Sequence, residues 1–300
     1  MSGMMINNTR NHTGMPEGFR ISLLVLYSFI LLGGTLNVLL MSCMLQSQKR
    51  LSYTKVSVIN LIAVHSVFLL TVPFRIYYYA FNETWILGLT FCKIVSLMIH
   101  AHMYLAFIFY AFLVIVRYVE HSDRQQKLQF HRILYATIPS AVIWLVIFGS
   151  IFPPTMVKYG NMQNDSTQCF HFGQALKSPA VKMLNYVICT VVILIWTVLA
   201  FFQLYFLLNV IKKHGRATRQ HQEFWAQMKN FVFLSVMFFC FVPYQGFRVY
   251  YVTDYGKTEK NTHINEVFLA ITAFSCFDMI VFAARDICKH KNSRRWFCCL

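Results

Sequence analysis

Seven apolar stretches dominate this 300-residue chain, and each is long enough to cross a lipid bilayer. A hydrocarbon core about 30 Å thick needs roughly 20 apolar residues of helix. Backbone groups inside lipid must be bonded within the protein, so each stretch is expected to be helical. The sequence therefore predicts an all-α membrane protein, a bundle of seven transmembrane helices, at residues 21–45, 56–81, 92–116, 134–157, 181–211, 230–252 and 267–284.

The composition excludes an ordinary soluble enzyme. Hydrophobic residues make up 57% of the chain and charged residues 13%, against about 25% charged in an average soluble domain. No Gly-rich phosphate loop, catalytic triad or metal motif is evident, so we expect no enzyme, no cofactor and no metal site. The predicted organisation is a tail at 1–20, one membrane domain of seven spans at 21–284, and a basic tail at 285–300 that can form a membrane-parallel helix.

The distribution of charge predicts the orientation in the membrane. The net charge is +16, and most of the 27 Lys and Arg residues fall on one side of the predicted spans. The positive-inside rule makes that side cytoplasmic, and anionic lipids, not nucleic acid, are the expected partners of these charges. We therefore expect a membrane protein with its N-terminus outside and its C-terminus in the cytoplasm. Four Asn-x-Ser/Thr glycosylation sites all fall on the outer side: Asn7, Asn11, Asn82 and Asn164.

The nine cysteines divide by their position along the chain. Cys92 opens the third span on the outer side, and Cys169 follows the fourth span in an outer loop. Both would meet an oxidising compartment, which predicts a disulfide, with two free thiols as the alternative. Cys298 and Cys299 lie beside the inner membrane face among basic residues, where S-palmitoylation is expected.

Short motifs occur along the whole chain in the order found in one known family. They are Asn37 in GGTLNV, Asn60 in NLIAVH, Trp85 in WILG, Arg117 in VRY, the lone Trp144, Pro243 in FVPY and Asp278 in DMIVF. With seven helices and the outer cysteine pair, the chain resembles a rhodopsin-like (class A) G-protein-coupled receptor. His65, Val116, Gln245 and Arg248 together resemble a poorly characterised orphan subgroup of that class.

The resemblance implies a multi-pass receptor of the plasma membrane that passes an extracellular signal to a heterotrimeric G protein, with an unknown ligand. A transporter or channel is the alternative from another class, but transporters usually carry internal repeats and several charges near the midplane. Another alternative is a seven-helix protein that needs no ligand and modulates other receptors. A ligand response would separate it from an ordinary receptor.

Several residues in the interior depart from the family pattern at its activation switch. His65 stands where the family has a sodium-binding aspartate, and hard cations prefer oxygen ligands, so sodium is expected to act weakly here. His65 either pairs with Asp278 or stays neutral against a backbone carbonyl or water. Phe241 replaces a tryptophan below the ligand site, Pro243 supplies the expected hinge, and Phe282 replaces a tyrosine.

The resemblance assigns G-protein coupling to Arg117 and Tyr118, although Arg117 could instead only reach toward the membrane surface. Val116 removes the acid that usually precedes the arginine. Glu223 is left as the ion-pair partner of Arg117. Tyr205 is expected to be the tyrosine on the cytoplasmic side of the fifth helix. An exposed ion pair contributes only about 0–1 kcal/mol. We therefore expect the Arg117–Glu223 ion pair to stabilise the resting state only weakly, and basal signalling to be measurable.

Polar residues near the outer ends of the spans predict the ligand class. They are Arg75, Lys93, His100, Tyr104, Gln245, Arg248 and Glu266. Ionisable groups inside a span usually face the bundle or a water-filled cavity, and three of these residues are cations. They predict a cationic rim for an anionic small molecule or lipid. In the alternative, Arg75 and Arg248 pair with Glu266 or with lipid phosphates.

Overall fold

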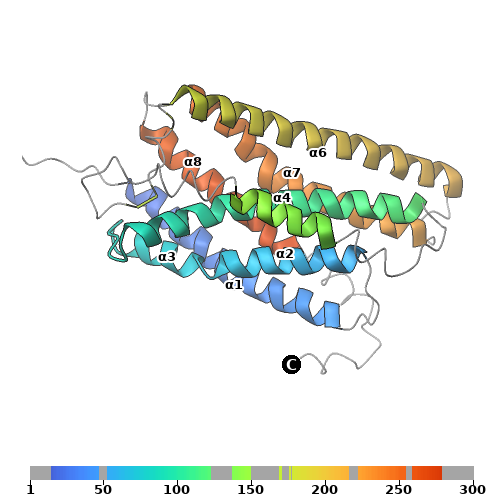
Figure 1. Cartoon of the computed structure of the whole chain (residues 1–300), viewed down its shortest axis with the longest axis horizontal. Helices are drawn as coiled ribbons and strands as arrows, with labels where there is room; N and C mark the ends of the chain where they lie inside the picture. Colours follow the sequence, from blue (N-terminus) through green and yellow to red (C-terminus); the bar gives the residue numbers. More distant parts are fainter. Residues whose placement is uncertain are drawn as a thin grey trace, which may run out of the picture.

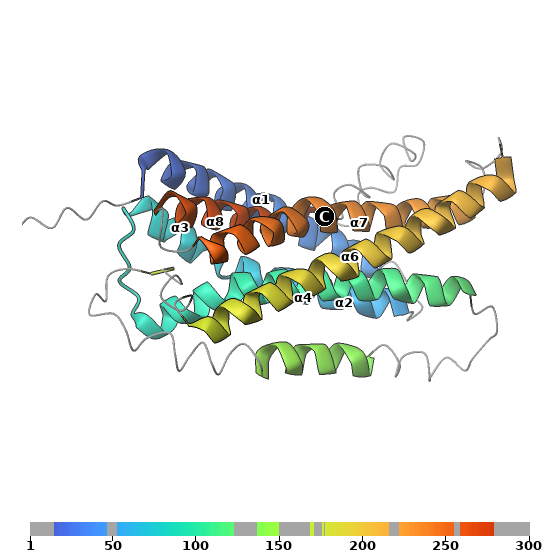
Figure 2. The same cartoon turned by 90° about the horizontal axis from the view of Figure 1, so that it is seen from above.

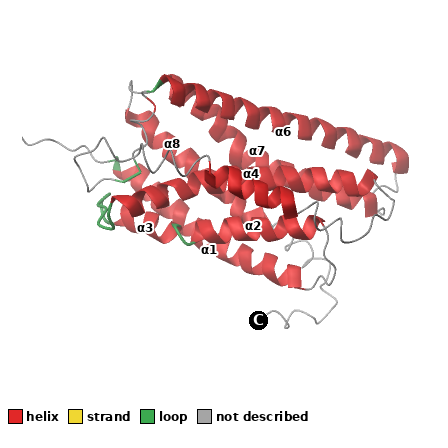
Figure 3. Ribbon diagram, in the orientation of Figure 1, coloured by secondary structure: helices red, strands yellow, loops and turns green. Residues whose placement is uncertain are grey.

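The structure is a computed structural model that contains helices, turns and short connecting segments, with no strand among the residues it describes (Figure 3). The all-α prediction is therefore confirmed. The described residues are 15–46, 53–122, 137–149, 169–170, 176, 178–215, 222–254 and 259–278.

A helix is present in each of the seven predicted spans (Figure 1). Five spans are built from helices long and apolar enough to cross a membrane, and the described parts of the fourth and seventh are shorter. The elements are α1 (Glu17–Gln46), α2 (Tyr53–Leu69), α3 (Val72–Ala80), α4 (Leu89–Ser122), the helix Thr137–Gly149, α6 (Pro179–His214), α7 (Gln222–Thr253), α8 (Glu259–Thr272) and the 3-10 helix η3 (Ala273–Phe277).

The helices run side by side along the long axis of the molecule, with α4 in the centre (Figures 1 and 2). Side chains of α4 are largely buried, whereas many apolar side chains of α1 and α6 are exposed, as lipid-facing helices require. The helix Thr137–Gly149 lies on one flank (Figure 2), where the Trp144 indole donates to Asn60 Oδ1 at 2.8 Å. From its central place α4 contacts α2, α6, α7 and η3.

The second predicted span is divided into two helices, which corrects the single helix expected at 56–81. The division follows from Pro73 at the start of α3, because proline has no backbone N–H to continue the helix. The Thr71 N–H instead closes a tight turn on the Phe68 carbonyl at 2.8 Å. Arg75, one turn into α3, is completely buried.

Two adjacent glycines let α1 approach the end of the seventh span. A Cβ added to Gly33 would overlap the ring of Phe277, and one added to Gly34 would lie 2.9 Å from a methyl carbon of Leu69. Because glycine has no side chain at these points, η3 packs directly on α1. This contact brings Asn37, one turn further along α1, to Asp278.

The predicted disulfide between Cys92 and Cys169 is confirmed, with their Cα atoms 5.8 Å apart. It joins the first turn of α4 to the segment that precedes α6. The next residue, Phe170, packs edge-to-face on Tyr78 of α3, with ring centres 4.9 Å apart. We call this end of the bundle the disulfide end, and the end where α4 finishes the Arg117 end.

Candidate functional site

Arg75 is completely buried at the disulfide end and contacts four separate parts of the chain. Its Nη1 donates to the Tyr27 hydroxyl of α1 at 3.2 Å and lies 4.0 Å from the Glu266 carboxylate of α8. Its Nη2 points to the Val95 carbonyl of α4 at 3.5 Å, and the Phe170 ring covers the guanidinium at 4.3 Å. Arg75 therefore joins α1, α3, α4 and α8.

This arrangement corrects the predicted rim of three cations. The guanidinium of Arg75 is engaged inside the bundle with Glu266, a pairing that the sequence also allowed. Lys93 is half-buried in the first turn of α4. Arg248 contacts a different set of residues on other helices. The two arginines therefore have different hydrogen-bond partners.

Arg248 of α7 bridges three helices through neutral partners. Its Nε donates to Asn185 Oδ1 of α6 at 3.1 Å, and its Nη1 donates to Asn265 Oδ1 of α8 at 3.2 Å. Its guanidinium carbon lies 5.4 Å from the centre of the Tyr251 ring. No carboxylate is among these contacts. Within the described part of the chain, the positive charge of Arg248 therefore interacts with two amide oxygens and the Tyr251 ring.

Three other predicted ligand residues lie near Arg248, on α4 and α7. His100 and Tyr104 are one turn apart on α4, both within electrostatic range of Arg248. Gln245 is buried one turn before Arg248; its Nε2 lies 3.9 Å from the Met103 sulfur, and its Oε1 has no hydrogen-bond partner among the described residues. The Arg248 cation therefore lies near His100, Tyr104 and Gln245, and the Gln245 Oε1 atom still lacks a hydrogen-bond partner among the described residues.

His65 lies in the middle of the bundle and meets a partner that the sequence did not predict. Its Nδ1 is 3.0 Å from Nε2 of His102 on α4, and the Cys276 sulfur of η3 is 3.4 Å from each of these nitrogens. The predicted pairing of His65 with Asp278 is wrong, because the second ring nitrogen of His65 has no hydrogen-bond partner within the described residues. His65 instead faces a second imidazole and a thiol.

Asp278 is engaged by two neutral donors. The amide of Asn37 on α1 donates to Oδ1 at 2.8 Å, and the Tyr110 hydroxyl of α4 donates to Oδ2 at 2.8 Å. The same hydroxyl lies 2.9 Å from the Ser275 carbonyl. Asn37 was visible as a sequence motif of the first helix, whereas Tyr110 carried no motif.

Phe241, predicted as a switch residue, is completely buried about two turns before Arg248 along α7. Its ring packs edge-to-face on Phe107 of α4, with centres 5.9 Å apart. Pro243 lies inside α7, where it removes one helical hydrogen bond. A deformable point of α7 therefore lies close to one of its contacts with α4. Phe282 lies outside the described residues.

The Arg117 end holds a chain of neutral hydrogen bonds. The side chains of Arg117 and Glu223 lie outside the described part of the structure, so their ion pair stays a prediction. The Tyr118 hydroxyl donates to Gln203 Oε1, and Gln203 Nε2 donates to the Gln227 carbonyl at 2.8 Å. These bonds join α4, α6 and α7.

The sequence did not single out Gln203, which lies inside the bundle two residues before Tyr205. The coupling role of Tyr205 stays a prediction. The Tyr205 side chain is 55% exposed, and its ring contacts only the neighbouring Phe206 among the ring contacts described. Gln203 is 1% exposed. The α6 residue that contacts Tyr118 is therefore Gln203.

Replacing Gln203 with Leu is expected to raise ligand-free signalling several-fold. The substitution removes the bonds that tie α6 and α7 to Tyr118, each worth about 0.5–1.5 kcal/mol, and a change of about 1.4 kcal/mol shifts a two-state balance tenfold. G-protein activation should be measured at matched surface levels, with Ser235→Ala as the control because its hydroxyl bonds only within α7. Unchanged activity in Gln203→Leu would show that this chain does not hold the resting state.

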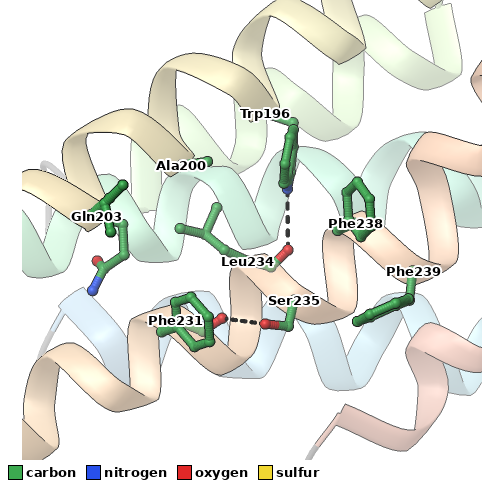
Figure 4. A pocket seen from close by; sticks show the side chains of 9 residues that line it. Trp196, Ala200, Gln203, Phe231, Leu234, Ser235, Phe238 and Phe239 are labelled. Atoms are coloured by element: carbon green, nitrogen blue, oxygen red, sulfur yellow. Dashed lines mark hydrogen bonds between the residues drawn. The ribbon is translucent and has the colours of Figure 1, made fainter. Parts of the chain in front are cut away.

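A shallow apolar groove lies between α6 and α7 on the flank of the bundle (Figure 4). The Trp196 indole donates to the Leu234 carbonyl at 3.1 Å across it. None of the predicted ligand residues lines the groove, and Phe239 at its edge is 68% exposed. It is therefore a lipid-facing surface. Its lining residues are Trp196, Ala200, Gln203, Leu204, Phe231, Leu234, Ser235, Phe238 and Phe239.

One predicted modification site lies in the described structure. Asn82 is exposed just after α3, and its side-chain oxygen accepts a hydrogen bond from Arg20. Its glycosylation stays a prediction. The other predicted sites lie outside the described residues: Asn7, Asn11, Asn164, Cys298 and Cys299.

Comparison with known proteins places this arrangement in a family. Residues 36–281 match the family described as 7 transmembrane receptor (rhodopsin family). The human Probable G-protein coupled receptor 141 is 39% identical over 301 residues, which cover 98% of each chain. The human Cysteinyl leukotriene receptor 2 is 27% identical over 292 residues, 92% of this chain and 81% of that protein. The 2-oxoglutarate receptor 1 of Rattus norvegicus is 23% identical over 246 residues, 81% and 73% of the two chains.

The family model spans residues 36–281, and the 39% identical relative matches 98% of the chain. The transporter or channel alternative is therefore dropped, and the chain is a multi-pass protein of the plasma membrane. It belongs to the rhodopsin-like (class A) family of G-protein-coupled receptors.

Proposed function

We propose that this receptor recognises an anionic small molecule or lipid at its disulfide end and activates a heterotrimeric G protein at its Arg117 end. In this proposal the disulfide end faces the outside of the cell. The observation that supports the ligand class is the surroundings of Arg248, whose described side-chain contacts are all neutral.

Arg248 suits an incoming anion better than Arg75 does. The fork of a guanidinium can donate two parallel N–H bonds to the oxygens of a carboxylate or phosphate. Such charge-assisted hydrogen bonds are about twice as strong as neutral ones. The amide oxygens of Asn185 and Asn265 occupy part of that fork and can be exchanged for a carboxylate. Arg75 already has the Glu266 carboxylate nearby, so a second anion there would meet a negative charge.

Two relatives support an anionic ligand class through their names. One is named for 2-oxoglutarate, a dicarboxylate, and the other for cysteinyl leukotrienes. They provide the first compounds to test.

Transmission would run along α7. Arg248 lies toward the disulfide end of this helix, Phe241 and Pro243 lie near its middle, and Gln227 joins the chain of hydrogen bonds at the Arg117 end. An anion that draws Arg248 away from Asn185 and Asn265 changes how α7 is held against α6 and α8. A ligand shifts the equilibrium between two helix arrangements only through such differential contacts.

Replacing Arg248 with Gln is expected to raise the half-maximal concentration of an active anion about 10- to 100-fold, because hydrogen bonds to charged groups contribute about 1.5–3 kcal/mol. G-protein activation should be recorded with 2-oxoglutarate, cysteinyl leukotrienes, and other carboxylates, phosphates and anionic lipids. Arg248→Lys should recover part of the response, since it keeps the charge but loses the fork. Lys182→Gln, another cation near the start of α6, is the matched control.

Arg117→Ala tests the coupling half of the proposal in the same assay, since it should abolish activation at matched surface levels. An active anion with equal potency on wild type and Arg248→Gln would show that a residue other than Arg248 binds the anion. Ligand-free activity that depends on Arg117, with no response to any anion, would favour the ligand-independent modulator.

A further inference from the structure

Three buried side chains from three separate elements converge in the interior of the bundle. His65 comes from α2, His102 from α4 and Cys276 from η3, and each is at most 1% exposed. One atom of each points to a common centre: Nδ1 of His65, Nε2 of His102 and the Cys276 sulfur. All three atoms lie within 4.8 Å of one another. Imidazole nitrogen and thiolate sulfur are the ligand types that zinc prefers.

The spacing of the three atoms is close to that of a tetrahedral zinc site. Bonds of about 2.0–2.1 Å to nitrogen and about 2.3 Å to sulfur place two nitrogens about 3.3 Å apart and nitrogen and sulfur about 3.6 Å apart. The observed distances are 3.0 Å between the nitrogens and 3.4 Å from the sulfur to each nitrogen. A movement of a few tenths of an ångström would therefore admit the ion.

The local charge also suits a divalent cation of this type. Zinc bound to one thiolate retains one positive charge, and the Asp278 carboxylate, two residues after Cys276, supplies one negative charge. An uncompensated charge inside the bundle would carry a large desolvation cost. Sodium, calcium and magnesium prefer oxygen ligands, so a set of two nitrogens and one sulfur selects against them.

We propose that His65, His102 and Cys276 bind a zinc ion that fastens α2, α4 and η3 together inside the receptor. Three protein ligands leave a fourth position, which a water molecule completes, as in zinc sites with an open position. The ion stabilises the helix arrangement in which the three ligands meet. Its removal is expected to loosen the contact of η3 with α2 and α4.

The test uses the full-length receptor, purified in detergent without chelators, with Cys288, Cys298 and Cys299 replaced by Ser. Zinc content should be measured by mass spectrometry, and cobalt should then be exchanged for zinc. We expect one zinc ion per receptor and a cobalt spectrum with the visible bands of four-coordinate geometry and a thiolate-to-cobalt charge-transfer band. Cys276→Ser should remove that band and most of the metal. Cys189→Ser, which removes another buried thiol, should keep both.

Removing the metal should lower the thermal midpoint of the wild type but leave that of Cys276→Ser unchanged. A wild-type receptor that holds no zinc and gives no tetrahedral cobalt spectrum would overturn the proposal and leave a hydrogen-bonded trio only. Equal zinc in Cys276→Ser and wild type would also overturn it, because the ion would then lie elsewhere. If Cys276→Ser fails to fold, His102→Gln replaces it, and the loss of four-coordinate bands is the expected result.

Discussion

Replacing Arg75 with Met is expected to lower the free energy of unfolding by about 3–5 kcal/mol, because it removes the cation that lies 4.0 Å from the buried Glu266 carboxylate. Glu266→Gln should have a comparable effect, since it leaves the completely buried guanidinium without a carboxylate. The thermal midpoint of the purified receptor, recorded in one detergent at one pH, measures both changes.

The double variant Arg75→Met/Glu266→Leu distinguishes a charge effect from a packing effect. Removing both charges leaves no buried ion unpaired, and replacing a buried pair by apolar residues is often neutral. We therefore expect the double variant to be more stable than either single variant, a non-additivity that a double-mutant cycle measures directly. Additive losses would show that Arg75 acts mainly through its contacts with Tyr27, Val95 and Phe170.

The sequence predicted the parts of this receptor that depend on length, composition and local motif. An apolar stretch that crosses a bilayer is helical whatever its neighbours, so the seven spans could be located without knowing their contacts. The disulfide followed from two cysteines on the same side of the membrane. Pro73 was visible too, but its effect on the second span depended on how the chain around it turns.

Pairings between helices could not be predicted in the same way, because they depend on how each helix is rotated. Gln203 and Tyr205 are two residues apart, which separates them by about 200° around α6, so only one can face the bundle. The family resemblance singled out the tyrosine for its place along the helix, and the structure places the glutamine inside the bundle. Likewise, whether His65 meets Asp278 or His102 depends on the relative positions of α2, α4 and η3.

The same limit applies to the candidate ligand site. The sequence offered Arg75 and Arg248 as equivalent cations and Glu266 as a partner for either. The structure separates them, because α8 brings Glu266 to Arg75 and brings Asn265 to Arg248. One residue along α8 turns the side chain by about 100°. Which arginine remains available to an anion is thus decided by the rotation of α8.

Removing the Cys92–Cys169 disulfide is expected to cost about 4 kcal/mol of stability, since it closes a chain segment with a sequence separation of 77 residues. The variant should be Cys92→Ser/Cys169→Ser, so that no reactive thiol is left behind. Cys189→Ser, a buried free cysteine of α6, is the matched control and should change the thermal midpoint far less. A midpoint equal to that of the wild type would show that the disulfide does not restrain the unfolded chain.

Removing the disulfide should also change the surroundings of Arg75, because the disulfide holds Phe170 over the Arg75 guanidinium. The Cys169 N–H approaches the Tyr78 hydroxyl at 3.4 Å, and Phe170 packs on the same ring. Without the disulfide this cover is free to leave, and water reaches Arg75 and Glu266. An ion pair exposed to water contributes much less than a buried one. Arg75→Met should therefore be less destabilising in the disulfide-free receptor than in the wild type, and an equal effect in both would show that Phe170 does not shield the pair.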